Sequence, residues 1–437
     1  MADLLLAGKR VILGVTGGIA AYKAADLCSK LVQAGAEVDV ILTEAAARFV
    51  ASLTFAALSG RPARVDLWTL PGGDPIPHVK MAGQADLVIV APLSANTLAK
   101  LALGLADNLL TATLLATPIK PVLTRGGLER ENAKTGENAK HEIHESGAPW
   151  VLAPAMETHM WTNPVTQAHM AALVARGAVQ VGPGVGRLAS GAAGAGRMAE
   201  PAEILAAARV ALVQGGPLSG RRVLVTAGGT QEPLDPVRYI TNASSGKMGV
   251  ALAEAARDLG AEVALVHAPL AVPAPFGVED VNVRTAVEMC EVVLSRIGQT
   301  DVLIGAAAVA DFRPAEAASQ KIKKTPGQEE LIVRLVRNPD ILGEVAARRA
   351  ESGRPRVVIG FAAETQELLA NAEAKLSAKK LDLIVANDVT EASSGFGADD
   401  NRVTLLYADG RQEGLPLMPK GEVAQRVLHV AVSLLKN

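Results

Sequence analysis

The sequence predicts an α/β protein made of two doubly wound domains, because one βαβ opening occurs twice. An apolar run at 10–15, a glycine turn, a helical pattern and a second apolar run at 37–42 come first. The same order returns over 222–266. Apolar runs without alternation are typical of parallel strands covered by helices on both faces. A solenoid would repeat about every 20–50 residues, and because the pattern here occurs only twice, two separate domains are favoured.

Length and composition set the broad class of the protein. The chain has 437 residues, 49% hydrophobic and 20% charged, so it can bury a core and is not intrinsically disordered. Its net charge of −2 gives no attraction to nucleic acid or to an acidic membrane. Two cysteines cannot form a disulfide framework and indicate a reducing cytosol. Without a signal peptide or an uncharged apolar run of about 18 residues, we expect a cytoplasmic protein with no membrane span.

The domain boundary is predicted near residue 216. A helical pattern over 201–213 leads into a linker with three glycines and a proline. The expected organisation is a first domain over 1–200, a helix and linker over 201–218, and a second domain over 219–437.

A polar stretch over 125–149 interrupts the first domain. It has neither helical nor strand periodicity and is predicted to be an inserted, exposed loop. His141 and His144 have the spacing of metal ligands, but a solvated loop is the commoner explanation for such residues.

Candidate ligand-binding residues in the first half follow the ends of predicted strands. Gly17 and Gly18 lie between a strand and a helix N-terminus, where bare N–H groups and the helix dipole attract phosphate. A tight βα joint without a ligand would need the same glycines. The turn lacks G-x-G-x-x-G, so it does not indicate NAD. Ser94 and Asn96 follow the strand predicted at 86–90 and can bind a ligand at its carboxyl end. His78 in a proline-rich loop is either structural or catalytic.

The second half has a corresponding strand, glycine turn and helix start. Ser244 and Ser245 are predicted to cap the helix and leave its N-terminus open to an anion, although the capped helix alone would explain them. The Walker A pattern G-x-x-x-x-G-K-[ST] is absent. Asp311 follows the strand predicted at 301–304, where ligands bind in such folds.

Three further residues of the second half bear on polyphosphate binding. Phe361 is expected to end the strand at 357–360, where it either stacks on a base or packs in the core. Lys375 and Lys379 lie four apart on one helix face and repel each other, which a polyanion would relieve. A salt-bridged surface helix is the alternative explanation.

The first half resembles the FMN-dependent cysteine decarboxylases of coenzyme A biosynthesis. The resemblance rests on Thr-Gly-Gly-Ile-Ala-Ala-Tyr-Lys at 16–23, His78, residues 92–97 and Pro-Ala-Met at 154–156, and covers residues 9 to about 200 except the loop. It implies a flavodoxin-like flavoprotein domain, assembled as trimers with the flavin at subunit contacts. The implied cofactor-binding residues are Gly17, Gly18, Ile19, Ala20, Thr43, Ser94, Asn96 and Thr97.

In this family the flavin oxidises the substrate thiol to a thioaldehyde, CO₂ leaves, and the reduced flavin returns the hydride. The resemblance makes His78 the base or the carboxylate-orienting group and Asn163 a substrate-binding residue. Two catalytic positions depart from the family. Its Pro-Ala-Met-Asn ends in Glu157 here, and Ser190 stands where many relatives carry a proton-donating cysteine. An ionised Glu157 would repel the substrate carboxylate.

The second half resembles phosphopantothenate–cysteine ligases over residues 219–437. The motifs, in order, are Asn-x-Ser-Ser-Gly-Lys-Met-Gly, Ala-Ala-Ala-Val-Ala-Asp, Lys-Ile-Lys-Lys, Gly-Phe-Ala-Ala-Glu-Thr and Ala-Asn-Asp-Val. The resemblance implies a Rossmann-like ligase domain that converts 4′-phosphopantothenate and CTP into an acyl-cytidylate, which the cysteine amine then attacks. Positioning, lysines and Mg²⁺ would carry the catalysis.

The resemblance also assigns roles to individual residues of the second half. Asn242 and Lys321 are the catalytic positions, Arg238 and Asn242 bind substrate, and Asp311 is a possible metal ligand. The implied nucleotide-binding residues are Ser244, Ser245, Gly246, Lys247, Ala307, Asp311, Lys321, Asn338, Pro339, Asp340, Ile341, Phe361, Lys375 and Lys379.

Together these patterns predict a bifunctional enzyme of coenzyme A biosynthesis with FMN, Mg²⁺ and CTP. It would be a homo-oligomer based on trimers, up to a dodecamer, acting on small molecules and on neither nucleic acid nor membranes. A ligase whose first half only binds flavin or serves as an assembly scaffold stays open because of Glu157 and Ser190. A dehydrogenase with two NAD-type domains is disfavoured because the fingerprint glycines are missing.

Overall fold

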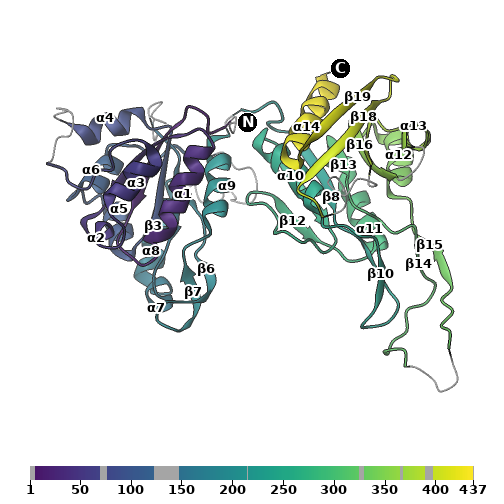
Figure 1. The fold of residues 1–437 in the computed structure, drawn as a ribbon, viewed down its shortest axis with the longest axis horizontal. Coiled ribbons are helices and arrows are strands. Elements are labelled where there is room, and N and C mark those ends of the chain that lie inside the picture. Colours follow the sequence, from purple (N-terminus) through teal and green to yellow (C-terminus); the bar gives the residue numbers. More distant parts are fainter. Residues whose placement is uncertain are drawn as a thin grey trace, which may run out of the picture. The chain divides into compact units, whose positions relative to one another are not determined.

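The computed structural model describes residues 5–68, 76–122, 147–213, 215–323, 329–364, 368–388 and 397–436. Backbone contacts divide the chain into two compact α/β units, residues 1–214 and 215–437 (Figure 1). The prediction of two doubly wound α/β units is confirmed. The polar stretch predicted as a loop over 125–149, with His141 and His144, lies outside the described residues except for its last three positions.

The first unit contains a five-stranded parallel sheet in the order β2-β1-β3-β4-β5. This is the flavodoxin-like order, in which the chain reverses direction across the sheet between β1 and β3. The strands are β1 (Arg10–Val15), β2 (Glu37–Leu42), β3 (Leu87–Leu93), β4 (Trp150–Pro154) and β5 (Val179–Gln180).

Helices cover both faces of this sheet. One group contacts α1, and the other packs on a cluster around Ile12, Val90 and Leu152. Strands with two covered faces need apolar side chains throughout, and β3 is buried along its whole length. The first group is α1 (Ala21–Gln33), α3 (Ser52–Ser59) and α9 (Pro201–Leu212), and the second is α4 (Pro77–Gln84), α5 (Ala95–Leu103), α6 (Leu109–Leu115) and α8 (Pro164–Ala175).

Two short helices and a hairpin complete the first unit near the carboxyl ends of its strands. Helix α2 (Glu44–Ala47) follows β2, and helix α7 (Thr158–Trp161) follows β4. Strands β6 (Gly184–Arg187) and β7 (Ala193–Arg197) form an antiparallel hairpin that packs on α7.

The second unit contains an eight-stranded sheet in the order β12-β11-β8-β13-β16-β17-β18-β19, parallel up to β17 and antiparallel beyond it. The parallel part has the Rossmann order, with the reversal between β8 and β13. The strands are β8 (Arg222–Ala227), β11 (Glu262–His267), β12 (Glu279–Asn282), β13 (Val302–Gly305), β16 (Val357–Glu364), β17 (Leu383–Asp388), β18 (Asp400–Tyr407) and β19 (Gln412–Pro419).

Two apolar clusters cover the faces of this sheet. Helices α10 (Lys247–Asp258) and α14 (Lys420–Lys436) pack on one face, and α11 (Ala286–Arg296), α12 (Ile341–Ser352) and α13 (Leu368–Ala378) pack on the other, with a 3₁₀ turn at Ile297–Gln299. Gly249 lets α10 approach β8 closely, because a Cβ at this position would clash with the Ala227 Cβ. The prediction that Phe361 ends its strand is wrong, since β16 continues for three more residues.

Two small antiparallel pairs extend from the second unit. Strands β9 (Gln231–Pro233) and β10 (Tyr239–Thr241) form a hairpin, and β14 (Phe312–Pro314) pairs with β15 (Leu335–Arg337). Strand β14 also contacts β9, so the two pairs lie side by side.

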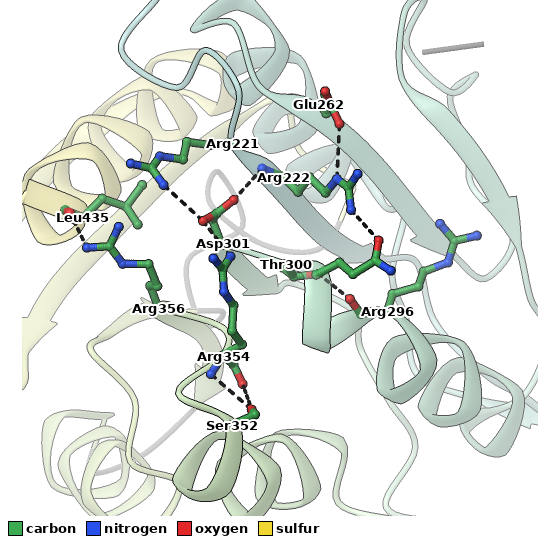
Figure 2. A network of polar contacts seen from close by, with 11 residues as sticks. Arg221, Arg222, Glu262, Arg296, Thr300, Asp301, Ser352, Arg354, Arg356 and Leu435 are labelled. Atoms are coloured by element: carbon green, nitrogen blue, oxygen red, sulfur yellow. Dashed lines mark hydrogen bonds and ion pairs between the residues drawn. The ribbon is translucent and has the colours of Figure 1, made fainter. Parts of the chain in front are cut away.

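The amino edges of the two sheets carry equivalent polar clusters. In the second unit Asp301 accepts hydrogen bonds from the Arg222 N–H at 3.0 Å and from Arg354 Nη1 at 2.8 Å (Figure 2). In the first unit Asp86 accepts from the Arg10 N–H at 2.9 Å and from Lys9 Nζ at 3.0 Å. The same arrangement therefore ties the first strand of each sheet to the strand that follows the reversal.

Among the described residues, no helix is both long enough and apolar enough to cross a membrane.

Candidate active sites

The carboxyl ends of β1 and β3 in the first unit are joined through one buried threonine. Thr16 follows β1 directly, and its hydroxyl donates to the Pro92 carbonyl at 2.7 Å and accepts from the Ser94 N–H at 2.8 Å. The Thr43 N–H after β2 donates to the Val15 carbonyl at 3.0 Å. Three of the segments predicted to bind the cofactor therefore meet at the place where the strand order reverses.

The glycine turn before α1 is closely packed on one side and open on the other. A Cβ on Gly17 would lie 2.5 Å from the Ala45 Cβ, whereas a Cβ on Gly18 would meet no atom within 4 Å. Ala20 is the N-cap of α1 and makes no side-chain cap. The N–H groups of Ala21 and Lys23 donate to the Gly18 and Ala20 carbonyls, both at 3.0 Å, but no side chain caps this 13-residue helix. A helix N-terminus without a side-chain cap, beside open space, is suited to a phosphate.

The polar side chains around this turn have local roles in the structure. The Thr43 hydroxyl accepts from the Ala46 N–H at 3.2 Å and caps α2, and the Ser94 hydroxyl accepts from the Thr97 N–H at 3.4 Å and caps α5. Asn96 is exposed in the first turn of α5. Of these side chains, Asn96 is therefore the one that points to solvent without serving as a cap.

Glu157, which departs from the family pattern, is the N-cap of α7. Its Oε2 accepts a hydrogen bond from the His159 N–H at 2.6 Å. The preceding Met156 N–H donates to the Gly196 carbonyl at 3.0 Å, and a Cβ on Gly196 would clash with the Met156 carbonyl oxygen. The hairpin β6–β7 is thus fastened to the segment that carries Glu157, and the carboxylate has a structural partner of its own.

The remaining predicted residues of the first unit lie on separate elements. His78 is half-buried in α4, and its Nδ1 is buried without a hydrogen-bond partner within the described residues. Ser190 is exposed in the turn of the β6–β7 hairpin. Asn163 caps α8, where its Oδ1 accepts from the Val165 N–H at 3.0 Å. No hydrogen bond among the described residues connects these three to one another.

The second unit contains a pocket of about 460 Å³ at the carboxyl edge of its sheet. It opens near the carboxyl ends of β8 and β13, between which the strand order reverses, and is also lined by Phe361 of β16. Eight of the fourteen residues predicted to bind nucleotide line it: Ala307, Asp311, Asn338, Pro339, Asp340, Ile341, Phe361 and Lys379.

Asn338 fixes two walls of this pocket against each other. Its Nδ2 donates to the Ala310 carbonyl at 2.7 Å, and its N–H donates to the Asp311 carbonyl at 2.8 Å. Its Oδ1 accepts from Arg313 Nη1 at 3.1 Å. The loop after β13 and the loop before α12 are therefore held together, and the exposed Asp311 side chain lies at their junction.

Lys379 has an acidic partner in the pocket. Its Nζ lies 3.0 Å from Oδ1 of Asp340, which also caps α12 by accepting from the Gly343 N–H at 3.1 Å. The predicted repulsion between Lys375 and Lys379 is therefore offset by a carboxylate from another element. Lys375 does not line the pocket.

The segment from Asn242 to Lys247 differs in part from its prediction. Asn242 Nδ2 donates to the Val309 carbonyl at 3.1 Å, beside the pocket wall. The serine caps are wrong: the N-cap of α10 is Gly246 at φ +73°, with no side-chain cap, and the Ser244 hydroxyl accepts from the Gly246 N–H at 3.3 Å. The left-handed backbone conformation at this N-cap favours glycine, so Gly246 stands at the position that the prediction gave to a serine.

Lys247 is engaged outside the pocket. Its Nζ lies 2.7 Å from Asp399 Oδ1 and donates to the Gly397 carbonyl at 2.9 Å. The Lys247 ammonium lowers the pKa of Asp399 from its ordinary value, chiefly through its hydrogen bond to the Asp399 carboxylate. Lys247 thus fastens the start of α10 to the segment before β18.

Buried Asp235 and exposed Arg238 form an ion pair in the loop of the β9–β10 hairpin. Arg238 Nη2 lies 2.6 Å from Asp235 Oδ2 and also donates to the Ile322 carbonyl at 2.9 Å. The hydrogen bonds from Arg238 hold the pKa of Asp235 well below its usual range. Lys321, which precedes Ile322, is exposed.

Sequence reasoning missed several residues of these sites. Thr226 and Arg337 line the pocket, Arg313 orients Asn338, and Asp235 anchors Arg238. A signal was present for Asp235, because aspartate between two prolines is typical of a turn that binds its own backbone. Within the described residues, no three His, Cys, Asp or Glu side chains gather to hold a metal ion.

Comparison with known families agrees with the division into two units. Residues 4–212 match the family described as Flavoprotein, and residues 218–434 match the DNA/pantothenate metabolism flavoprotein C-terminal domain. The Vibrio cholerae protein described as coenzyme A biosynthesis bifunctional protein CoaBC is 43% identical over 97% of this chain and 98% of its own length. The chain belongs to this bifunctional family.

A second curated relative gives the same result. The Bacillus subtilis protein of the same description is 43% identical over 99% of each chain. A crystal structure of the C-terminal domain of a CoaBC protein is 39% identical, covers 51% of this chain and 99% of that one, and superposes with a TM-score of 0.43. The prediction of a bifunctional enzyme of coenzyme A biosynthesis, with ligase and decarboxylase activities, is confirmed. The ligase-only and dehydrogenase alternatives are not retained.

Proposed function

We propose that the second unit joins 4′-phosphopantothenate to cysteine with CTP, and that the first unit decarboxylates the product with FMN. The observation that carries the ligase assignment is the pocket of about 460 Å³, which gathers Asp311, Asn338, Phe361 and Lys379 where the strand order reverses. An aromatic ring, amide groups, a carboxylate and an ammonium in one pocket suit a base and a phosphate chain at the same time.

Charge neutralisation would fall to the lysines and to a magnesium ion. Lys379 lies in the pocket, and Lys321 precedes a backbone segment that is hydrogen bonded to the β9–β10 loop. Mg²⁺ usually takes one or two protein carboxylates and completes its shell with phosphates and water. The exposed carboxylate of Asp311 fits that pattern, whereas a structural metal cage would need more ligands.

The proposed reaction has two displacement steps and no protein nucleophile. A carboxylate oxygen of 4′-phosphopantothenate attacks the α-phosphorus of CTP, and pyrophosphate leaves. The amine of cysteine then attacks the acyl carbon, the amide bond forms, and CMP and a proton are released. Asn242, fixed by the Val309 carbonyl, would position the substrate for the first step.

The residues of the first unit fit the phosphate of FMN. The start of α1, which has no side-chain cap, and the open space at Gly18 would hold the phosphate. The exposed Asn96 side chain on α5 would add a polar contact to the cofactor. Bound FMN would supply the electron acceptor that the loss of CO₂ requires. His78, whose Nδ1 has no partner among the described residues, would orient the carboxylate or accept a proton. Asn163 has its oxygen occupied and would offer its amide NH₂ to the carboxylate.

A homo-oligomer based on trimers is part of the proposal. Four large apolar side chains around the glycine turn, α2 and α3 are exposed: Ile19 at 63%, Tyr22 at 62%, Phe49 at 52% and Leu53 at 76%. Exposed apolar groups in one region are typical of surfaces that a partner covers. We propose that another copy of the chain covers them and completes the flavin site.

The test is an assay of both half-reactions on one anaerobic preparation of the full chain. Pyrophosphate should appear with CTP, Mg²⁺ and 4′-phosphopantothenate before cysteine is added. CO₂ should appear when phosphopantothenoylcysteine is supplied to the yellow protein. A colourless preparation would contradict the FMN assignment, and absence of pyrophosphate would contradict the CTP assignment.

A further inference from the structure

We propose that Asp235 is a positioning residue for the coupling reaction and acts by holding the backbone that carries Lys321. The proposal rests on the function proposed for the second unit. Asp235 lies in the loop between β9 and β10 and touches neither the pocket nor Lys321 itself. Its effect would be transmitted through Arg238 and Ile322.

Asp235 is buried and accepts hydrogen bonds at both carboxylate oxygens. Oδ1 accepts from the Val237 N–H at 2.9 Å and the Arg238 N–H at 2.8 Å. Oδ2 accepts from Arg238 Nε at 3.0 Å and from the Ile322 N–H at 3.1 Å. The side chain is 0% exposed. A buried carboxylate with this many donors is fixed in position, because each lost donor would leave a charge unsatisfied.

The Ile322 peptide is held from both sides. Its N–H donates to Asp235, and its carbonyl accepts from Arg238 Nη2 at 2.9 Å. Four residues earlier, the Ala318 N–H donates to the Leu234 carbonyl at 2.9 Å. The segment from 318 to 322 is therefore docked on the β9–β10 loop, although 87 residues separate Asp235 from Ile322 in the sequence.

Docking at Ile322 restricts the backbone of Lys321. Placing a lysine ammonium on a phosphate group loses conformational entropy of both the side chain and the backbone that carries it. A fixed backbone removes part of that loss before the substrate binds. Lys321 is exposed and is the neighbour of the docked peptide, so its ammonium is presented from a defined point.

The same geometry changes what is expected of Arg238. Two of its guanidinium nitrogens, Nε and Nη2, are bonded to Asp235, and Nη2 also reaches Ile322. Its charge is therefore balanced inside the loop. Arg238 connects Asp235 to the docked segment, and Lys321 remains as a cation of that segment that can meet the phosphates.

The decisive experiment is a double-mutant cycle on the full chain with its flavin. Asp235→Asn should lower kcat/KM for CTP-dependent pyrophosphate release by about ten- to a hundred-fold, because it removes a charge-assisted network. Lys321→Ala should lower it by about a hundred- to a thousand-fold. If Asp235 acts through Lys321, the double variant should be close to Lys321→Ala alone. Multiplied effects would overturn the proposal.

A matched control and a second variant separate positioning from unfolding. Asp409 also bonds the N–H and Nε of a following arginine, Arg411, at 3.1 and 2.7 Å, but lies outside the pocket. Asp409→Asn should leave pyrophosphate release unchanged. Ile322→Pro removes the N–H donor and keeps the Asp235–Arg238 pair. It should reproduce the Asp235→Asn kinetics, with flavin absorbance intact, and normal kinetics in Ile322→Pro would contradict the proposal.

The outcomes distinguish this inference from the function on which it rests. An unmodified chain that releases no pyrophosphate with CTP contradicts the proposed function. An active unmodified chain in which Asp235→Asn behaves like Asp409→Asn contradicts only the role of Asp235.

Discussion

The two units use the same topological position differently. In the first unit the carboxyl edge of the sheet offers an open glycine turn bordered by exposed apolar side chains, and its threonine and serine hydroxyls cap helices. In the second unit the corresponding edge forms a pocket with an acid, an amide, an aromatic ring and a lysine from one chain. The second unit thus gathers its polar and aromatic side chains in one pocket, whereas the first leaves apolar side chains exposed beside its glycine turn, on the surface that we propose another copy covers.

The largest expected effect separates the chemistry of the two units. Lys321→Ala should reduce CTP-dependent coupling about a hundred- to a thousand-fold, because the ammonium that we propose neutralises developing phosphate charge is lost. Bound flavin, measured by its absorbance, should be unchanged. Loss of flavin together with coupling would contradict the independence of the two sites.

The polar clusters at the amino edges should differ in their contribution to stability. The Asp301 side chain is 7% exposed and pairs with two arginines, while the Asp86 side chain is 36% exposed and pairs with one lysine. Asp301→Asn should therefore lower the free energy of unfolding by about 2–4 kcal/mol. Asp86→Asn should lower it by about 1 kcal/mol or less. Chemical denaturation of each variant measures both, and equal losses would contradict this comparison.

The two glycines of the first site should respond in opposite ways. Gly17→Ala places a Cβ 2.5 Å from that of Ala45 and should destabilise the first unit by about 1–3 kcal/mol. Gly18→Ala meets no atom and should leave the melting temperature unchanged while reducing flavin occupancy, because its methyl group enters the proposed phosphate space. Thermal unfolding and flavin absorbance distinguish the two, and full flavin occupancy in Gly18→Ala would argue against that site.

Glu157 tests the first site further. If Glu157 faces the substrate carboxylate as the resemblance implies, Glu157→Asn should raise the decarboxylation rate about tenfold, since the repelling charge is removed. Asparagine is also a good N-cap, so α7 should be retained. Glu157→Gln removes the charge with a poorer cap and serves as the matched variant. A rate that stays constant or falls in both would show that the repulsion argument is wrong.

The smallest effect is the acid dependence of the second unit. The pKa of Asp235 is lowered in the folded state by Arg238, so its contribution to stability is present above the unfolded pKa of about 3.9 and decreases as the pH falls below it. The difference in unfolding free energy between the unmodified chain and Asp235→Asn should be constant above about pH 5. It should shrink in more acidic buffer, and a difference that is independent of pH would contradict the assignment.

The fold was predictable because its signals are local. The apolar runs at β1 and β8, the glycine turns and the strand before Asp311 are short patterns, and the structure contains all of them. Such patterns report periodicity and turn chemistry, which act between neighbouring residues.

The arrangement of the sites was less predictable because it depends on contacts between distant residues. The bond from Lys247 to Asp399 spans 152 residues, so the motif Ser-Ser-Gly-Lys alone cannot show that its lysine is engaged away from the pocket. The hydroxyl of Ser94 looks equally available for a ligand or for a helix cap until the backbone is known. The roles of the predicted site residues stay predictions that the variants above address.

The polar clusters at the amino edges of the two sheets also bear on how the gene for such a chain could arise or be split. Each sheet is fastened at its amino edge by residues from its own unit: Arg10 and Asp86 in one, Arg222 and Asp301 in the other. Neither unit needs a residue of the other for these polar contacts. Splitting the gene at the linker would therefore leave each product with its own polar cluster at the amino edge of its sheet, at the opposite edge from its candidate site.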